Sequence, residues 1–95
     1  MAAPHFLVHG KTDTVGVVVV EGVKAGQTLT GWLMEGNKTL KVKVLNNIPI
    51  GHKLALNDIK KGDTIMKYEH DIGVAVANIK KGGHAHVQNV KTKRW

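Results

Sequence analysis

Val20-Glu-Gly-Val-Lys-Ala-Gly-Gln-Thr-Leu29 sets out a pattern that recurs twice further along the chain. Leu56-Asn-Asp-Ile-Lys-Lys-Gly-Asp-Thr-Ile65 and Val76-Ala-Asn-Ile-Lys-Lys-Gly-Gly-His-Ala85 share its apolar ends, its central Val or Ile, its lysine and its glycine. Asp and Asn can hydrogen-bond forward into a turn, and glycine accepts backbone angles that other residues avoid. Each stretch is therefore predicted to form strand, turn and strand. The spacings of 36 and 20 residues are unequal, which argues against a solenoid.

The chain around these turns has the pattern of short strands. Residues 17–20 are four consecutive valines, a β-branched run that suits a strand. Residues 39–45 alternate strictly, with Leu40, Val42 and Val44 facing one way and two lysines facing the other, as in a half-buried strand. Helical periodicity is almost absent, and glycines recur at short intervals. We therefore predict an all-β fold, a single small domain of short strands and tight turns.

Length and composition limit what this domain can do alone. A chain of 95 residues and 10.3 kDa buries roughly 64% of the surface that its unfolded form exposes. Only four residues are aromatic and none is cysteine, so the core is built from aliphatic side chains without disulfides or thiolate metal sites. A deep catalytic cleft is not expected in so small a core, and we expect the chain to need a partner.

Charge and apolar runs indicate the cellular compartment and the class of partner. We expect a cytoplasmic protein, because the N-terminal residues lack a signal-peptide pattern and no apolar run approaches the ~20 residues of a membrane span. The formal net charge of +7 favours an anionic partner. Nucleic acid is disfavoured, because the basic residues are scattered in pairs and no aromatic residues interleave with them. Solvated turn lysines are the alternative explanation for much of the charge.

Three clusters carry side chains suited to chemistry. In Ile48-Pro-Ile-Gly-His-Lys53, neighbouring residues of a strand point to opposite faces, so His52 and Lys53 share a target only if Gly51 distorts the strand. An edge histidine beside a solvated lysine is the alternative. Around Tyr68, Glu69 and Asp71 lie two residues apart and can form paired carboxylates, although solvated charge is the better interpretation.

The third cluster is Gly82-Gly-His-Ala-His86. His84 and His86 share one face of a strand and can together hold a transition metal or, when charged, an anion. Two ligands do not complete a metal site, so further ligands would have to come from His5, His9, His70 or another chain. An exposed histidine pair is the alternative. No phosphate-binding loop and no nucleophile–base pattern can be identified.

Taken together, these motifs resemble a known family. Ile48-Pro-x-Gly-His-Lys-x-Ala-Leu-x-Asp-Ile-x-x-Gly62, Lys67-Tyr68, Ile72-Gly-x-Ala75 and Ile79-x-x-Gly-x-His-x-His-x-x-Asn89 resemble the SAF-type domain of the altronate and galactarate dehydratase family. The similarity runs from about residue 9 to residue 89, which predicts one domain over 1–95 with a basic tail at 90–95. The Ile-Pro-x-Gly-His-Lys cluster is specific to the family, whereas the Asp-Ile-x-x-Gly turns are common to all SAF domains.

The resemblance implies a β-clip fold and a large (beta) catalytic partner subunit. Free-standing members of this length are similar to the small subunit of a carbon–sulfur lyase that eliminates sulfite from (2R)-3-sulfolactate to give pyruvate, a subunit expected to be inactive alone. The alternatives are the small subunit of a sugar-acid (altronate-type) dehydratase, a hydro-lyase, and a non-catalytic basic binding module. The family's eliminations are similar in depending on iron(II) or another divalent metal, which we expect to be held mostly by the partner.

The resemblance also suggests roles for individual residues. His52, Lys53 and Tyr68 are the candidate catalytic residues, and His9, His52, Lys53 and His84 are the candidates for binding a small anionic hydroxy acid. His84 and His86 are candidate metal ligands. The chain departs from the family in two places: Glu69 stands where glycine is frequent, and Gln88 stands where a third histidine is frequent.

Overall fold

The computed structural model describes residues 3–68, 70–86 and 89–91, and within these ranges the chain forms strands and turns without an α-helix. The all-β prediction is confirmed. No helix in the described ranges could cross a membrane. Glu69, Gln88 and tail residues 92–95 lie outside the described residues. The strands are β1 (Phe6–Val8), β2 (Val15–Val18), β3 (Thr28–Leu33), β4 (Lys38–Lys43), β5 (Lys53–Ala55), β6 (Thr64–Lys67), β7 (His70–Ala75), β8 (His84–Ala85) and β9 (Val90–Lys91).

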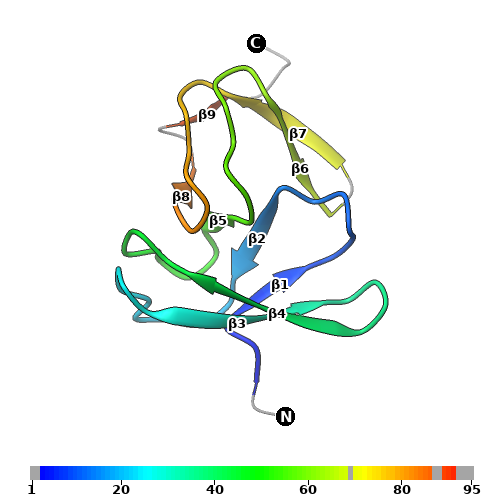
Figure 1. Cartoon of the computed structure of the whole chain (residues 1–95), viewed down its shortest axis with the longest axis vertical. Helices are drawn as coiled ribbons and strands as arrows, with labels where there is room; N and C mark the ends of the chain where they lie inside the picture. The colour runs from blue at the N-terminus through cyan, green and yellow to red at the C-terminus, as the bar shows by residue number, and fades with distance from the viewer. Residues whose placement is uncertain (1–2, 69, 87–88, 92–95) are drawn as a thin grey trace.

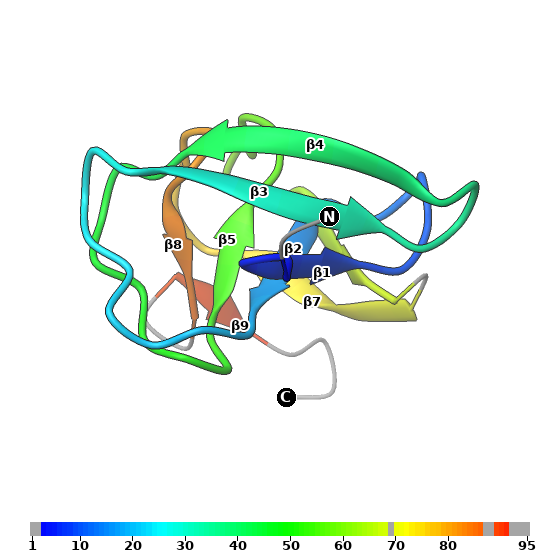
Figure 2. The ribbon, with the colours of Figure 1, turned by 90° about the horizontal axis from the view of Figure 1, so that it is seen from below.

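Two sheets hold these strands. The larger has the order β4-β3-β1-β2-β5-β8 and the smaller has the order β6-β7-β9. Only β1 and β3 pair in parallel, and every other pair of named strands is antiparallel. The small sheet lies at one end of the long axis and the β3–β4 pair at the other, with β2 and β5 between them (Figure 1). Seen from below, β3 and β4 cross one side of the molecule as a long pair (Figure 2).

The structure follows the predicted strand at 39–45 more closely than the one predicted at 17–20. In β4, Val42 is buried and its neighbouring lysines are exposed, as the alternation predicted. The valine run forms a strand only up to Val18, and β2 begins earlier, at Val15. The boundary shifts because Val15 pairs with Ala55 of β5, while the chain beyond Val18 leaves the sheet toward the turn at Gly22.

The repeated stretch occurs four times in the structure, because residues 45–54 adopt the same turn as 20–29, 56–65 and 76–85. In each turn a backbone N–H donates to the carbonyl three residues earlier: Gln27 to Lys24, His52 to Pro49, Asp63 to Lys60 and Gly83 to Lys80, at 2.8–3.2 Å. The glycines before these donors, Gly26, Gly51, Gly62 and Gly82, all have φ between 84° and 94°. We call these segments the four turns.

The four turns pack as two antiparallel pairs. Val23 bridges Ile48, and Ile59 bridges Ile79. The first pair contributes to a core around Phe6, and the second contributes to a separate core around Ile65. The central Val or Ile of every turn is therefore buried, and the four turns contribute to two separate cores.

The Asp and Asn side chains of the turns bond differently from the prediction. Forward bonds into their own turns were expected. Instead Asn47, Asp58 and Asn78 each accept a backbone N–H from the paired turn, at 2.8–3.0 Å. The antiparallel bridge brings the partner's free N–H within reach of the side-chain oxygen, so these residues join two turns.

Candidate active site

His52 stands at the end of turn 45–54, where the chain enters β5. Its carbonyl accepts the N–H of Val18 at 2.9 Å, and the N–H of Gly51 donates to the carbonyl of Val18 at 2.8 Å. Gly51 has φ 84°, in the left-handed region. The sequence required such a distortion for His52 and Lys53 to act together, and the structure supplies it at that residue.

His84 and His86 come from β8 and the residue that follows it. β8 pairs with β5, with Leu54 opposite His84 (Figure 1). The Asn46 side-chain oxygen accepts the backbone N–H of His84 at 3.0 Å. The Asn89 amide donates to the His84 carbonyl at 2.7 Å and its oxygen accepts the His86 N–H at 2.9 Å. Two asparagine side chains therefore fix the backbone that carries both histidines.

His52, His84 and His86 meet as one group, which we call the histidine cluster. His52 Nδ1 and His84 Nε2 lie 2.8 Å apart, so one ring donates a hydrogen bond to the other. Their centroids are 5.1 Å apart and their planes differ by 18°, as in an edge-to-edge contact. The His86 ring stacks on His52 at 3.7 Å and 16°. The predicted sharing of a face by His84 and His86 is confirmed, and the third ring is His52 instead of His5, His9 or His70.

The surroundings of His84 and His86 favour the neutral form of these two rings. Burial lowers the pKa of His84, and the charges of His52, His86 and Lys53 lower it further. Burial also lowers the pKa of His86, with smaller contributions from His52 and Lys53. Within the part of the chain that the structure describes, His86 Nδ1 is buried and has no hydrogen-bond partner. The cluster therefore offers unprotonated nitrogens that can accept a proton.

The cluster also has the donor atoms of a metal site. One ring nitrogen from each histidine lies within 4.8 Å of the others, and neutral imidazole is a common ligand of divalent transition metals. Metal–nitrogen bonds of about 2.1 Å place tetrahedral ligand atoms about 3.4 Å apart. The 2.8 Å between His52 and His84 is shorter, and stacking keeps His86 in a different plane. As they are arranged, the rings fit a shared proton better than a shared ion.

A second group, the tyrosine cluster, consists of His9, Lys67 and Tyr68. The His9 and Tyr68 rings meet edge to face with centroids 5.8 Å apart, and Lys67 Nζ lies 5.5 Å from the Tyr68 centroid. The half-buried Lys53 interacts electrostatically with both clusters. Burial and the charge of Lys67 lower the pKa of Lys53, and the charge of Lys53 contributes to lowering the pKa of His84. The six predicted site residues thus form two groups linked through Lys53.

The remaining sequence candidates lie elsewhere. The His5 ring accepts the backbone N–H of Thr30 at 2.9 Å, and His70 is exposed on β7. Asp71 accepts the N–H of Gly73 at 3.1 Å, and its predicted pairing with Glu69 falls outside the described residues. Sequence patterns assigned no role to Asn46 or to the buried Asp13. Alignment of turn 45–54 with the other three turns would have marked its neighbour Asn47, at the position of Asp58 and Asn78, and not Asn46 itself.

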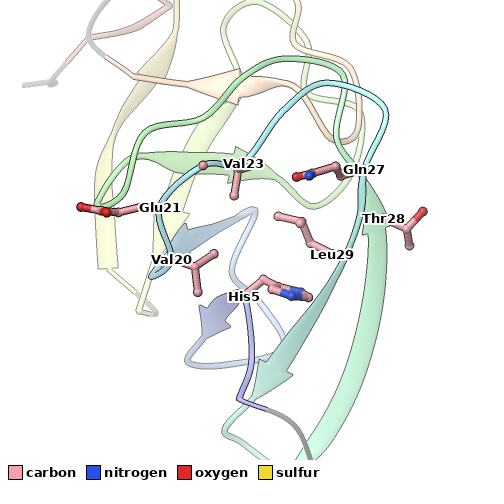
Figure 3. A pocket seen from close by; sticks show the side chains of 8 residues that line it. His5, Val20, Glu21, Val23, Gln27, Thr28 and Leu29 are labelled. Carbon is pink, nitrogen blue, oxygen red and sulfur yellow. The ribbon is translucent and has the colours of Figure 1, made fainter.

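A cavity of about 450 Å³ shares no residue with either cluster. Val20, Val23 and Leu29 form its apolar part beside the His5 ring, while the Glu21 and Thr28 side chains point outward at its edges (Figure 3). A second cavity, of about 250 Å³, is lined by apolar side chains together with the polar or charged residues Lys11, Asp13, Lys41, Asn57 and Lys81. Neither cavity brings together the imidazole, phenol and ammonium groups that the two clusters combine.

Comparison with known proteins places the chain among lyase components. Residues 4–93 match the altronate/galactarate dehydratase SAF domain. The chain is 58% identical over 90 residues to the (2R)-sulfolactate sulfo-lyase subunit alpha of Chromohalobacter salexigens, covering 95% of this chain and 96% of that protein.

Two further relatives cover less of the chain. The (2R)-sulfolactate sulfo-lyase subunit alpha of Paracoccus pantotrophus is 49% identical over 62% of this chain and 88% of its own length. The altronate dehydratase of Bacillus subtilis is 45% identical over 56% of this chain, but the match covers only 11% of that longer protein.

Proposed function

The chain belongs to the altronate/galactarate dehydratase SAF-domain family, and from that premise we propose that it is the small subunit of a lyase that eliminates sulfite from (2R)-3-sulfolactate. The observation that carries the proposal is the 58% identity, over nearly the whole length of both chains, to a sulfo-lyase subunit alpha. The subunit acts with a large subunit in the cytoplasm, the compartment that the cysteine-free composition favours, and is inactive alone.

Exposed apolar side chains beside the histidine cluster support the need for a partner. Ile50 and Val19 are 50% and 37% exposed. Their backbone segments are adjacent, because the N–H of Gly51, which follows Ile50, bonds to the carbonyl of Val18, which precedes Val19. Adjacent exposed apolar residues are typical of an interaction surface. The large subunit is expected to cover this edge, enclose the clusters and exclude water from the reaction.

The substrate's two anionic groups match the chemistry of the clusters. Lys53, which is half-buried, supplies a positive charge, and the Tyr68 phenol and His9 ring supply hydrogen-bond donors for a carboxylate or sulfonate. His52 also orients the anion, and its bond to His84 fixes the direction of its ring. Together these side chains hold the substrate with its reacting carbons toward the large subunit.

The elimination itself moves one proton and one electron pair. A base removes the proton at C2, the new carbon–carbon double bond forms, and the sulfonate leaves C3 as sulfite with the electrons of the carbon–sulfur bond. The resulting enol becomes pyruvate. Neutral His84 and His86 can accept a proton and assist the leaving group. A divalent metal such as iron(II), held mostly by the large subunit, would supply positive charge beside the carboxylate.

Dehydration of a sugar acid is the second candidate reaction, because two altronate dehydratases are similar in sequence to more than half of this chain. It eliminates hydroxide instead of sulfite from a carbon next to the acidic C–H. The non-catalytic binding module is disfavoured by the names of the relatives and by the convergence of three histidines. Steep salt dependence of DNA or RNA binding would be its mark.

The test is to mix the purified small subunit with the purified large subunit of the same lyase and supply 3-sulfolactate or altronate. Release of sulfite and pyruvate from 3-sulfolactate by the complex, and by neither subunit alone, is the expected result. Turnover of altronate without sulfite release would identify the dehydratase instead. A complex that turns over neither substrate would overturn both assignments.

A further inference from the structure

Asp13 is a buried carboxylate in the loop between β1 and β2, with an exposed fraction of 6%. Its Oδ2 atom accepts the backbone N–H of His9 at 3.0 Å, of Gly10 at 3.3 Å and of Tyr68 at 3.0 Å. Burying a charge is costly unless hydrogen bonds compensate for lost hydration. Three converging N–H groups provide that compensation and make the carboxylate the link between two distant segments.

One of these segments holds a residue in an uncommon conformation. Tyr68 has φ 51°, a left-handed value that large side chains seldom adopt. The N–H that this conformation presents is the one bonded to Asp13. Released from this bond, the backbone of Tyr68 would be free to relax to a negative φ, and the ring would turn away with it.

The other segment carries the ring that Tyr68 contacts. Asp13 binds the N–H of His9, and the His9 and Tyr68 rings meet edge to face at 5.8 Å. Lys67 precedes Tyr68, and its ammonium lies 5.5 Å from the tyrosine ring. One carboxylate therefore fixes the backbone under both rings of the tyrosine cluster, and one of these residues, Tyr68, directly follows the cluster's lysine in the chain.

We propose that Asp13 is a positioning residue that holds His9 and Tyr68 together as a unit for binding one anionic group of the substrate. The inference rests on the proposed function, because that function supplies the anion. Asp13 acts through the backbone and does not contact the substrate. The N–H groups of His9, Gly10 and Tyr68 stabilise the buried charge, and their dipoles offset part of its field toward an anion bound beyond the rings.

The test compares Asp13→Asn with a matched control, a second carboxylate that accepts a backbone N–H from the same loop. Glu35 also accepts a backbone N–H, from Lys11 at 3.3 Å, but Glu35 is exposed and holds neither ring. Each variant small subunit is mixed with the wild-type large subunit. Asp13→Asn is expected to raise KM for 3-sulfolactate about tenfold with a smaller change in kcat, a loss of about 1.4 kcal/mol in binding. Glu35→Gln is expected to change neither.

A spectroscopic measurement separates positioning from general stabilisation. Tyr68 is the only tyrosine, so 3-fluorotyrosine in the small subunit gives one ¹⁹F signal from the complex. Asp13→Asn is expected to shift that signal and to abolish its response to added sulfite, while Glu35→Gln leaves both unchanged. If Asp13→Asn does not assemble, Asp13→Glu, which displaces the carboxylate by one methylene, is measured in the same way.

The possible outcomes keep the two proposals apart. An unchanged KM and an unchanged ¹⁹F signal in an assembled Asp13 variant would overturn the positioning role while sulfite release continues. An equal effect of Glu35→Gln would also overturn it. A wild-type complex that releases no sulfite contradicts the proposed function, and the shift of the tyrosine signal then still reports whether Asp13 fixes the ring.

Discussion

Turns 45–54 and 56–65 have the same backbone and different uses. The N–H of His52 bonds to Pro49 O at 3.1 Å, and the N–H of Asp63 bonds to Lys60 O at 2.9 Å. In turn 56–65 the Asp63 side chain closes the turn by accepting the N–H of Lys60 at 2.9 Å. In turn 45–54 the equivalent donor does not exist, because Pro49 has no N–H.

This difference explains how a structural turn carries a functional side chain. The Gln27 side chain also closes its own turn, by accepting the N–H of Lys24 at 3.0 Å. His52 stands at the same position as Gln27 and Asp63, but Pro49 offers no N–H from which the His52 ring could accept the equivalent hydrogen bond. Its ring is therefore free to bond His84. A single proline thus separates the two roles without changing the shape of the turn.

The largest expected effect is the loss of activity on replacing the freed histidine. His52→Ala removes the bond to His84 and the stacking surface of His86, so we expect sulfite release by the complex to fall at least ~100-fold. The comparison variant is His70→Ala, which removes an exposed histidine from β7 and should keep full turnover. Size-exclusion chromatography checks that both variants assemble. Undiminished turnover by assembled His52→Ala would remove His52 from the active site.

Replacing two of the turn glycines separates the cost of a strained backbone conformation from the cost of a steric clash with a neighbouring strand. Gly62 and Gly82 have φ of 94° and 84°. A Cβ on Gly62 meets no atom within 4 Å, whereas a Cβ on Gly82 would lie 2.0 Å from the Lys43 carbonyl oxygen. Gly62→Ala should cost about 1 kcal/mol of unfolding free energy and Gly82→Ala about 2 kcal/mol more. Urea denaturation measures both, and equal losses would show that β4 moves aside at no cost.

The sequence predicted the parts of this molecule that depend on local patterns. Three of the four turns, the alternating strand β4 and the shared face of His84 and His86 follow from spacing along the chain. The fourth turn was missed because proline and histidine replace its usual lysine and capping residue. The contact between His52 and His84 spans 32 residues and depends on the pairing of β5 with β8. Strand order of this kind is not encoded in either segment alone.

The role of Asp13 could not be predicted from the sequence for the same reason. Its bond to Tyr68 joins residues 55 apart in the chain, and it requires β6 to end beside the loop that precedes β2. Its partners are backbone N–H groups, which every residue except proline carries, so no side-chain pattern marks them. Sequence reasoning finds groups of chemically distinctive side chains, and it misses a carboxylate whose partners are main-chain atoms.

Restoring the missing donor should have the next largest effect. Pro49→Ala returns an N–H to turn 45–54 at the position that Gln27 and Asp63 close in their own turns. His5 shows that imidazole can accept a backbone N–H in this fold, from Thr30 at 2.9 Å. If the His52 ring then bonds within its turn about nine-tenths of the time and to His84 for the rest, turnover should fall about tenfold, or about 1.4 kcal/mol.

The change is measured as sulfite release and as the ¹⁵N chemical shift of the His52 imidazole. Pro4→Ala serves as the control, because it removes a proline outside the four turns. A Pro49→Ala complex with full turnover and an unchanged His52 signal would show that the pairing of β5 with β8 alone directs the ring.

The smallest expected effect is loss of the cap in the structural turn. Asp63→Ala removes the side-chain bond to the N–H of Lys60 and leaves the backbone bonds of turn 56–65 in place. Because this bond is exposed, water replaces it, and we expect a loss of only ~0.5–1 kcal/mol in unfolding free energy with unchanged turnover. Urea denaturation and sulfite release measure the two properties separately. A drop in turnover at full stability would mean that turn 56–65 also serves the active site, and the division between a structural and a functional turn would then have to be abandoned.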